Sequence, residues 1–344
     1  MSARVSSVAC GAVLRRNGFL NSPHVLSVAP MMERTDRHCR YFLRLLSPNS
    51  WLYTEMITAA ALVDGRRFHL LEFHPDEHPV ALQLGGSEPG KLAQAARFGA
   101  TAGYDEINLN VGCPSDRVQS GRFGAALMAE PEKVADCVNA MAEAVDIPIT
   151  VKTRLGIDDL DSYEFLHQFV EIVSGAGCRT VVIHARKALL SGLSPKENRQ
   201  IPPLDYGRVH RLKSDYPSLK VILNGGLDTE EKTVGQLDFV DGVMLGRQAY
   251  LNPYFLGELD SKLFGGAPVP SRERALGDFL PYVRQELDRG TPLKVMTRHL
   301  LGLYAGCPGG RAWRRFLGEL PSGEEGFAAL ERVEPASAHA AAMA

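Results

Sequence analysis

Eight short β-forming segments that each end in glycine or polar residues constrain this fold more than any other feature of the sequence. Between them lie amphipathic stretches with helical spacing, at residues 89–101, 132–145, 163–174 and 206–216. Strict alternation of β and α segments implies a parallel sheet, and eight units over about 230 residues match a closed barrel better than an open doubly wound sheet. We therefore expect an α/β fold, a TIM (β/α)8 barrel over residues 23–262. The eight segments are 25–31, 52–57, 79–85, 106–111, 148–154, 180–186, 220–226 and 242–248.

The pattern changes after residue 270, where helical spacing continues without further strands. The helical stretches are 272–288, 292–305 and 311–320, which predicts a small C-terminal helical domain over residues 270–325. We expect residues 1–22 to form a disordered or weakly ordered extension and residues 326–344 to form a tail.

Composition narrows the class of protein. A net charge of −2 and a pI near 6.6 argue against a uniformly basic nucleic-acid coat, so any contact with nucleic acid must be local. The six cysteines include no CxxC pair and fit reduced thiols in a cytoplasm. No apolar run reaches the roughly 18–20 residues that span a bilayer, so we expect no membrane segment.

The ends of the last two predicted strands suggest a phosphate site. In this fold phosphate is commonly held after the seventh and eighth strands. Here those strands end in Asn224-Gly225-Gly226 and in Gly246-Arg247, which supply backbone N–H groups and one guanidinium. Glycine is also expected at tight βα turns for geometric reasons alone, so both interpretations stand at this point.

Other strand ends carry groups that suit an anionic, conjugated cofactor. Lys152 and His184 bring cationic groups to the same rim, and Gln83 adds an amide. Pro30, Met31 and Met32 could form an apolar floor for a ring system. Each residue alone could be structural, since lysine can extend to solvent and methionine often fills a core. As a set, they resemble a flavin mononucleotide (FMN) site, with Lys152 near the pyrimidine side of the flavin.

The segment 106–114 delivers a thiol to the end of the fourth predicted strand. Cys113 follows Val111-Gly112 directly. Because an unperturbed thiol has a pKa of about 8.5, it is mostly protonated near neutral pH and can donate a proton. The alternative is a small buried thiol of structural importance.

A cluster of potential metal ligands precedes the third predicted strand. Pro75 interrupts any helix that would align these side chains, and their spacing does not fit a preformed site, so we expect no metal. The cluster comprises His69, Glu72, His74, Asp76, Glu77 and His78.

The helical region contains a local basic patch. Residues 292–316 include no acidic residue, and Trp313 and Tyr304 could add stacking surfaces for bases. A run of charge is more often a solvated helix face, so the patch alone does not identify RNA binding. Its basic residues are Lys294, Arg298, Arg311, Arg314 and Arg315.

The motifs resemble those of the tRNA-dihydrouridine synthase family over residues 25–320. The branch that modifies positions 20 and 20a of the tRNA D-loop is suggested by residues 192–199 together with 311–315. The family motifs are Ala29-Pro30-Met31, Thr35-Asp36-Arg37-His38, Asn108-Leu109-Asn110-Val111-Gly112-Cys113-Pro114-Ser115, Val151-Lys152-Thr153-Arg154, Ile183-His184-Ala185-Arg186 and Asn224-Gly225-Gly226.

This resemblance implies an oxidoreductase with resident FMN and transient NADPH that reduces the C5=C6 bond of uridine in tRNA. Hydride would pass from flavin N5 to C6, and Cys113 would give a proton to C5. The resemblance implies no metal and no obligate protein partner. Implied FMN contacts are Pro30, Met31, Met32, Gln83, Lys152, His184, Asn224, Gly225, Gly226, Gly246 and Arg247. Implied tRNA contacts are Asn110, Lys196, Arg199, Arg311 and Arg314.

Two other functions remain open from the residues. One is an FMN barrel enzyme that acts on a free pyrimidine or another small conjugated substrate, for which the basic patch would have no use. The other is a non-catalytic tRNA-binding module, against which the presence of Cys113 and Lys152 speaks.

Overall fold

The computed structural model describes residues 24–115, 121, 123–266 and 268–333, which divide into two compact units. The first comprises residues 24–33 and 51–246, and the second comprises residues 34–50 and 247–333. The expected extension at 1–22 lies outside the described residues. No helix in the described part of the chain is long and apolar enough to cross a membrane.

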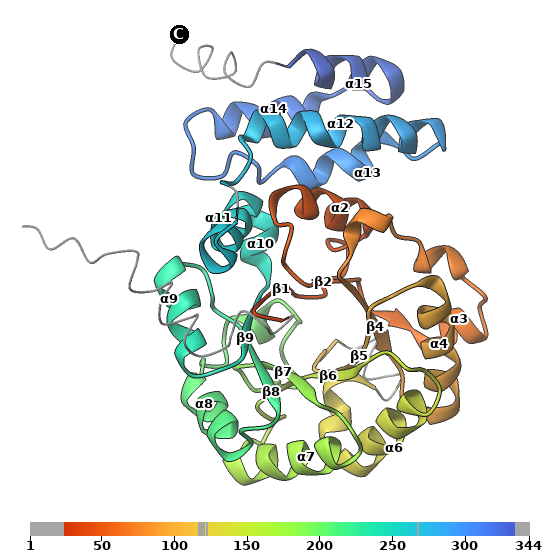
Figure 1. Cartoon of the computed structure of the whole chain (residues 1–344), viewed down its shortest axis with the longest axis vertical. Coiled ribbons are helices and arrows are strands. Elements are labelled where there is room, and N and C mark those ends of the chain that lie inside the picture. Colours follow the sequence, from red (N-terminus) through yellow and green to blue (C-terminus); the bar gives the residue numbers. More distant parts are fainter. Residues whose placement is uncertain (1–23, 116–120, 122, 267, 334–344) are drawn as a thin grey trace, which may run out of the picture. The chain divides into compact units, whose positions relative to one another are not determined.

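The first unit is a parallel barrel, as the sequence predicts (Figure 1). Its strands follow the order β1-β9-β8-β7-β6-β5-β4-β2, and β3 also pairs with β4. The ring closes between β1 and β2, where Val28 N–H donates to Trp51 O and Trp51 N–H donates to Leu26 O, both at 2.9 Å. The strands are β1 (Leu26–Val28), β2 (Leu52–Tyr53), β3 (Ile57–Thr58), β4 (Val80–Gly85), β5 (Glu106–Val111), β6 (Ile149–Arg154), β7 (Thr180–His184), β8 (Lys220–Asn224) and β9 (Gly242–Leu245).

The segment expected as one strand at 52–57 is two short strands, because Thr54 interrupts the ladder. Thr54 N–H donates to Ala81 O at 2.9 Å, but the next donor of β4, Gln83 N–H, bonds to the Thr54 hydroxyl at 3.0 Å. A side-chain oxygen thus replaces a backbone acceptor, a substitution that threonine favours outside regular structure.

Helices surround the barrel and have the boundaries that their spacing predicts to within a few residues (Figure 1). Ser162 caps α7 by accepting from Phe165 N–H at 3.1 Å, and Gly103 ends α4 in the left-handed region at φ 99°. The described α-helices of this unit are α3 (Ala59–Val63), α4 (Pro89–Ala102), α6 (Pro131–Ala142), α7 (Tyr163–Gly175), α8 (Tyr206–Asp215) and α9 (Glu230–Val234).

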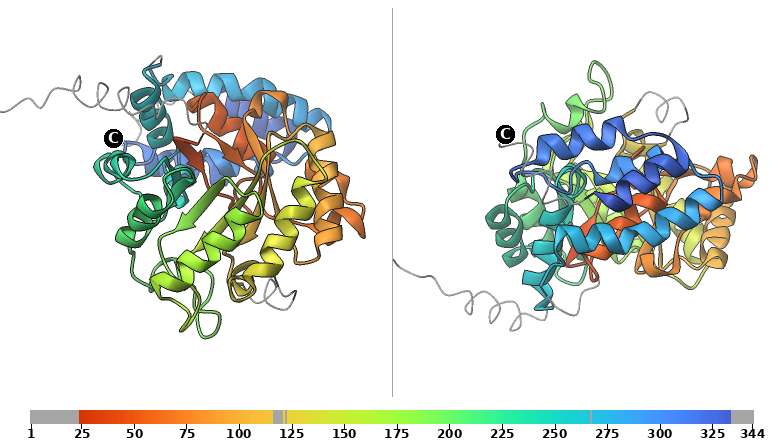
Figure 2. Two further views of the ribbon diagram at one scale, coloured as in Figure 1. Left: turned by 60° about the horizontal axis from the view of Figure 1, so that its bottom comes forward. Right: turned by 90° about the horizontal axis from the view of Figure 1, so that it is seen from above.

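The second unit is helical and has its own core (blue helices in Figure 2). Segment 34–50 belongs to this unit because Asp36 caps α2 and pairs with His299, while Arg37 donates to Glu286 at 2.6 Å. The assignment of residues 23–262 to a catalytic barrel domain and of residues 270–325 to a helical tRNA-binding domain stays a prediction. The helices are α2 (Arg37–Leu46), α10 (Arg247–Leu251), α11 (Pro253–Phe264), α12 (Arg272–Asp288), α13 (Leu293–Thr297), α14 (Gly310–Glu319) and α15 (Gly323–Arg332).

Two features of this unit differ from expectation. Helix α15 was not predicted, although Phe327 and Leu330 pack in the core. The expected stacking surfaces Trp313 and Tyr304 are 1% and 8% exposed. Trp313 Nε1–H donates to Leu300 O at 2.8 Å, so its polar atom is satisfied inside the core. Because both rings are buried, neither can stack on a base.

Candidate active site at the carboxyl ends of the strands

Alternation along β5 and β6 sends a column of polar side chains into the barrel. Residues two apart on a strand face the same side, so Thr150, Lys152 and Arg154 share one face. The register pairs Lys152 with Asn110 of β5 and Arg154 with His184 of β7. Most of the expected cofactor residues are therefore neighbours at one end of the ring.

Asn110 shapes the loop that carries the thiol. Its Oδ1 accepts from Gly112 N–H at 3.1 Å and from Cys113 N–H at 3.0 Å, while its Nδ2 donates to Gln83 Oε1 at 2.9 Å. The Cys113 thiol, which is partly exposed, donates to Ser115 Oγ at 3.4 Å. Three predicted site residues are thus linked directly.

A second group of predicted residues forms around Lys152. Its Nζ donates to Asn224 Oδ1 at 3.1 Å, and Asn224 Nδ2 donates to Met244 O at 2.7 Å. Burial, together with the nearby cation Arg154, lowers the pKa of Lys152 to about 7. The same causes hold the pKa of His184 well below its usual value. Neither Lys152 nor Arg154 forms an ion pair with a described carboxylate, so the site has positive charge without a protein counter-ion.

The glycines after β8 are required by the backbone. Gly225 and Gly226 have φ values of +114° and +67°, which side chains rarely adopt. An added Cβ at Gly225 would lie 2.6 Å from His184 Cδ2, whereas one at Gly246 would meet no described atom within 4 Å. The backbone at Gly246 therefore leaves space for a ligand. Arg247 begins α10 in the second unit.

Arg154 holds the loop between β7 and α8 to the cysteine loop. Its Nε donates to Gly112 O at 2.8 Å, and its Nη1 donates to Lys187 O and Asn198 O, both at 3.0 Å. Asn198 in turn bonds three backbone groups of this loop. The predicted RNA contacts Lys196 and Arg199 flank it and are exposed.

The remaining predicted residues lie after β1 and on α14. Pro30, Met31 and Met32 follow β1 after Ala29, and Met32 is 55% exposed. Arg311 and Arg314 are exposed on α14 of the second unit.

The sequence did not single out several polar residues of this site. Arg154 belongs to the motif Val151-Lys152-Thr153-Arg154. Its role in joining two loops depends on backbone carbonyl groups that are distant from it in sequence. Glu106, Asn108 and Thr150 are buried below Asn110. Their alternation with apolar residues was the available signal, because polar side chains on the inner face of a barrel must bond one another.

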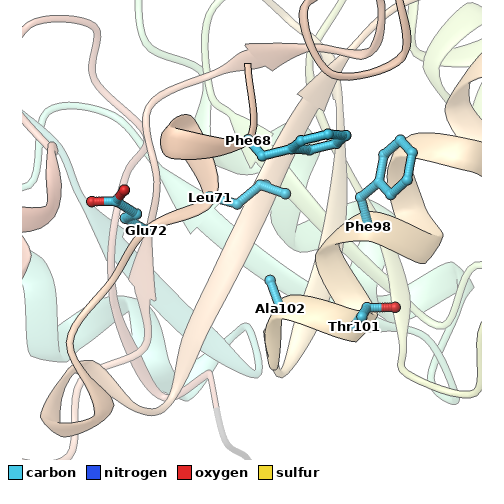
Figure 3. A pocket seen from close by; sticks show the side chains of 6 residues that line it. All are labelled: Phe68, Leu71, Glu72, Phe98, Thr101 and Ala102. Carbon is cyan, nitrogen blue, oxygen red and sulfur yellow. The ribbon is translucent and has the colours of Figure 1, made fainter. Parts of the chain in front are cut away.

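Two other features do not form part of this site. A shallow hollow of about 310 Å³ lies where the ring of Phe68 faces Phe98 above Leu71 (Figure 3). In the cluster of potential metal ligands at residues 69–78, His74 and Glu77 cap a short 3-10 helix, and His78 contacts Asp105 at 2.7 Å. The described residues contain no group of three or more potential metal ligands.

Comparison with protein families gives a match over nearly the whole chain. The model of the dihydrouridine synthase (Dus) family matches residues 27–341. The chain belongs to the dihydrouridine synthase family. This membership confirms the resemblance seen in the motifs.

Three relatives are similar over most of their length, and each is named tRNA-dihydrouridine(20/20a) synthase. The protein of Shewanella oneidensis is 56% identical over 304 residues, covering 88% of this chain and 90% of the relative. That of Vibrio cholerae is 56% identical over 315 residues (91% and 95%). That of Escherichia coli is 57% identical over 295 residues (85% and 85%).

Solved structures support the barrel fold. A 2-naphthoyl-CoA reductase complex is 12% identical with a TM-score of 0.52, covering 71% of this chain and 50% of that one. Morphinone reductase is 12% identical with a TM-score of 0.50, covering 73% and 88%.

The contacts of Arg154 predict a local effect of replacing it by lysine. Arg154→Lys removes the planar fork that reaches three carbonyls, so the loop at 186–204 should open more readily by about 2 kcal/mol. Hydrogen–deuterium exchange of that loop measures the change. Arg179→Lys, at an exposed position before β7, is the control. Equal exchange in both variants would contradict this role of Arg154.

Proposed function

We propose that this family member reduces the C5=C6 bond of uridine in the tRNA D-loop, with FMN as cofactor and NADPH as reductant. The names of its relatives support positions 20 and 20a as targets. The observation that carries the proposal is the meeting of Cys113, two amides and two cationic groups without a described carboxylate partner at one end of the barrel. The five described cysteines are free thiols, which agrees with the cytoplasm as its place of action.

The residues present fit an anionic flavin. Lys152 and Arg154 lack a described carboxylate partner, and an anion would supply one. The turn at Gly225 and Gly226 with the open space at Gly246 suits a phosphate approached by backbone groups. Gln83, Lys152, His184 and Asn224 would face the ring, with Pro30, Met31 and Met32 alongside, and Arg247 completes the proposed set. When bound, FMN supplies the hydride for C6.

The protein's own groups place the proton. Cys113 would give its thiol proton to C5, and the thiol needs a fixed position to do so. The two N–H bonds to Asn110 and the Arg154 bond to Gly112 O hold its backbone. The thiol itself contacts Ser115 Oγ at 3.4 Å.

Exposed basic side chains supply the proposed contacts to tRNA. Lys196 and Arg199 lie on the loop after β7, and Arg311 and Arg314 lie on α14. The target uridine must unstack from its neighbours in the tRNA loop to be reduced, which costs a few kcal/mol. Contacts between the basic side chains and the tRNA phosphates offset this cost.

The acid role predicts a selective loss in Cys113→Ala. We expect tRNA reduction to fall by about 10²–10⁴-fold, because the proton donor is gone, while NADPH still reduces the flavin at the normal rate. Dihydrouridine formation and flavin bleaching measure the two steps separately. Cys307→Ala, which removes another partly exposed thiol, should behave as wild type. Normal tRNA reduction by Cys113→Ala would exclude the role.

The lowered pKa of Lys152 predicts that FMN binding takes up a proton. Below pH 7 the lysine is already charged, whereas above pH 7 the free protein must bind a proton before Lys152 can interact, as a cation, with the pyrimidine side of the flavin. The Kd for FMN should therefore rise between pH 7 and 9, by up to about tenfold per unit. In Lys152→Gln the Kd should be higher at pH 7 and nearly independent of pH. Titration of flavin fluorescence measures the Kd at each pH. An equal slope of log Kd against pH in the wild type and in Lys152→Gln would contradict the role of Lys152.

The exposed arginines of α14 predict a change in salt dependence. Arg311→Glu combined with Arg314→Glu should weaken tRNA binding and flatten the plot of log Kd against log salt by about 0.7–0.9 per lost phosphate contact. The matched control is Arg97→Glu with Arg179→Glu, the same charge change at exposed positions of the barrel unit. Flavin spectra should be unchanged in both. An equal change of tRNA affinity and salt dependence in the two double variants would show that only the net charge of the protein affects binding.

A further inference from the structure

A continuous chain of hydrogen bonds runs through the barrel interior below the proposed site. Glu106, at its base, accepts from Tyr53 Oη at 2.8 Å, from Thr150 Oγ1 at 2.6 Å and contacts His24 Nε2 at 2.6 Å. Glu106, Asn108 and Asn110 alternate on β5 and are all at most 9% exposed. The proposed chemistry assigns no task to Glu106, Asn108 or Thr150.

The bonds of this chain all point the same way. Asn110 Nδ2 donates to Gln83 Oε1 at 2.9 Å, and Gln83 Nε2 donates to Asn108 Oδ1 at 2.7 Å. Asn108 Nδ2 donates to Thr150 Oγ1 at 2.8 Å, which leaves the Thr150 proton for Glu106. Every donor between Cys113 and Glu106 is thus directed toward the carboxylate.

Both ends of the chain enforce this direction. At one end the N–H groups of Gly112 and Cys113 can only donate, and at the other the Glu106 carboxyl oxygens accept from Thr150 and Tyr53. Rotating any of the three amides between them would set a donor against a donor in a buried place. The amide orientations are therefore fixed before any ligand binds.

The fixed direction determines what the amides offer to a ligand. Asn110 Oδ1 uses both lone pairs on backbone N–H groups, so only one hydrogen of its Nδ2 remains. Gln83 keeps one N–H and one lone pair. Asn110 can then only donate, which suits a ring carbonyl and opposes an exocyclic amino group. Uracil has a carbonyl group at C4, where cytosine has an amino group.

We infer that Glu106 and Thr150 are positioning residues, which fix the orientation of Gln83 and thereby lock Asn110 as a donor toward a pyrimidine carbonyl. This inference rests on the proposed function, since that function supplies the pyrimidine. Neither residue acts on the substrate directly, because Asn108, Gln83 and Asn110 stand between them and the strand ends.

Removing the Thr150 hydroxyl tests the chain with little change of shape. Thr150→Val leaves Asn108 Nδ2 without its acceptor, and Thr150→Ser keeps the hydroxyl. The control Thr153→Val makes the same change on the same strand, where the side chain faces outward and bonds Val111 O at 3.3 Å. Asn108→Leu breaks the next bond of the chain and serves where Thr150→Val does not fold.

Two measurements separate positioning from a structural role. Hydrogen exchange of the side-chain amides of Gln83 and Asn110, followed by NMR in the purified protein, reports on the chain itself. Single-turnover reduction of tRNA by prereduced enzyme, per bound flavin, reports on its use. We expect about tenfold faster exchange and about tenfold slower reduction in Thr150→Val, with recovery in Thr150→Ser. Thr153→Val should lower only the melting temperature.

The outcomes distinguish this inference from the proposed function. Wild-type reduction per flavin in folded Thr150→Val or Asn108→Leu overturns the inference, even where amide exchange changes. Unchanged amide exchange in these variants overturns it as well. A wild-type protein that binds no flavin and leaves tRNA unreduced refutes the proposed function instead.

Discussion

The site depends on the inward alternation of polar side chains along β5 and β6. A closed parallel barrel buries every second side chain of each strand, and a buried polar group without a partner is strongly unfavourable. Glu106, Asn108 and Asn110 therefore bond to neighbours on β4 and β6 rather than to water. The loop with Cys113 is built on the last member of this column, so its geometry follows from the interior of the barrel.

The sequence predicted the barrel because two periodicities alternate along it. A period of two marks strands and a period near 3.6 marks helices, and both signals are local. The positions of Cys113, Lys152, Asn224 and Gly225 at strand ends were predictable, because the fold places all these ends on one rim. The strand order confirms the predicted barrel and the family match confirms the resemblance, whereas the tasks of individual residues remain proposals.

Features that depend on partners distant in the chain could not be predicted. Trp313 and Tyr304 stand among basic residues, but a core formed by five helices encloses them. Segment 34–50 follows a barrel strand in sequence, yet Asp36 pairs with His299 in the helical unit. Thr54 splits a strand because its hydroxyl meets Gln83 N–H. Each case needs a contact that no local pattern encodes.

Lys152 shows how such a site trades stability for binding. Its pKa is about 7 in the folded protein but near 10.5 when unfolded, so between these values the unfolded chain binds more protons. Stability of the free protein then rises as pH increases from 7 toward 10.5, and at neutral pH the buried lysine is destabilising. An anion that pairs with the charged form removes this penalty and stabilises the folded state by mass action. Among the described residues no carboxylate pairs with Lys152, which is thus a stability defect in the free barrel and a source of affinity for an anionic cofactor.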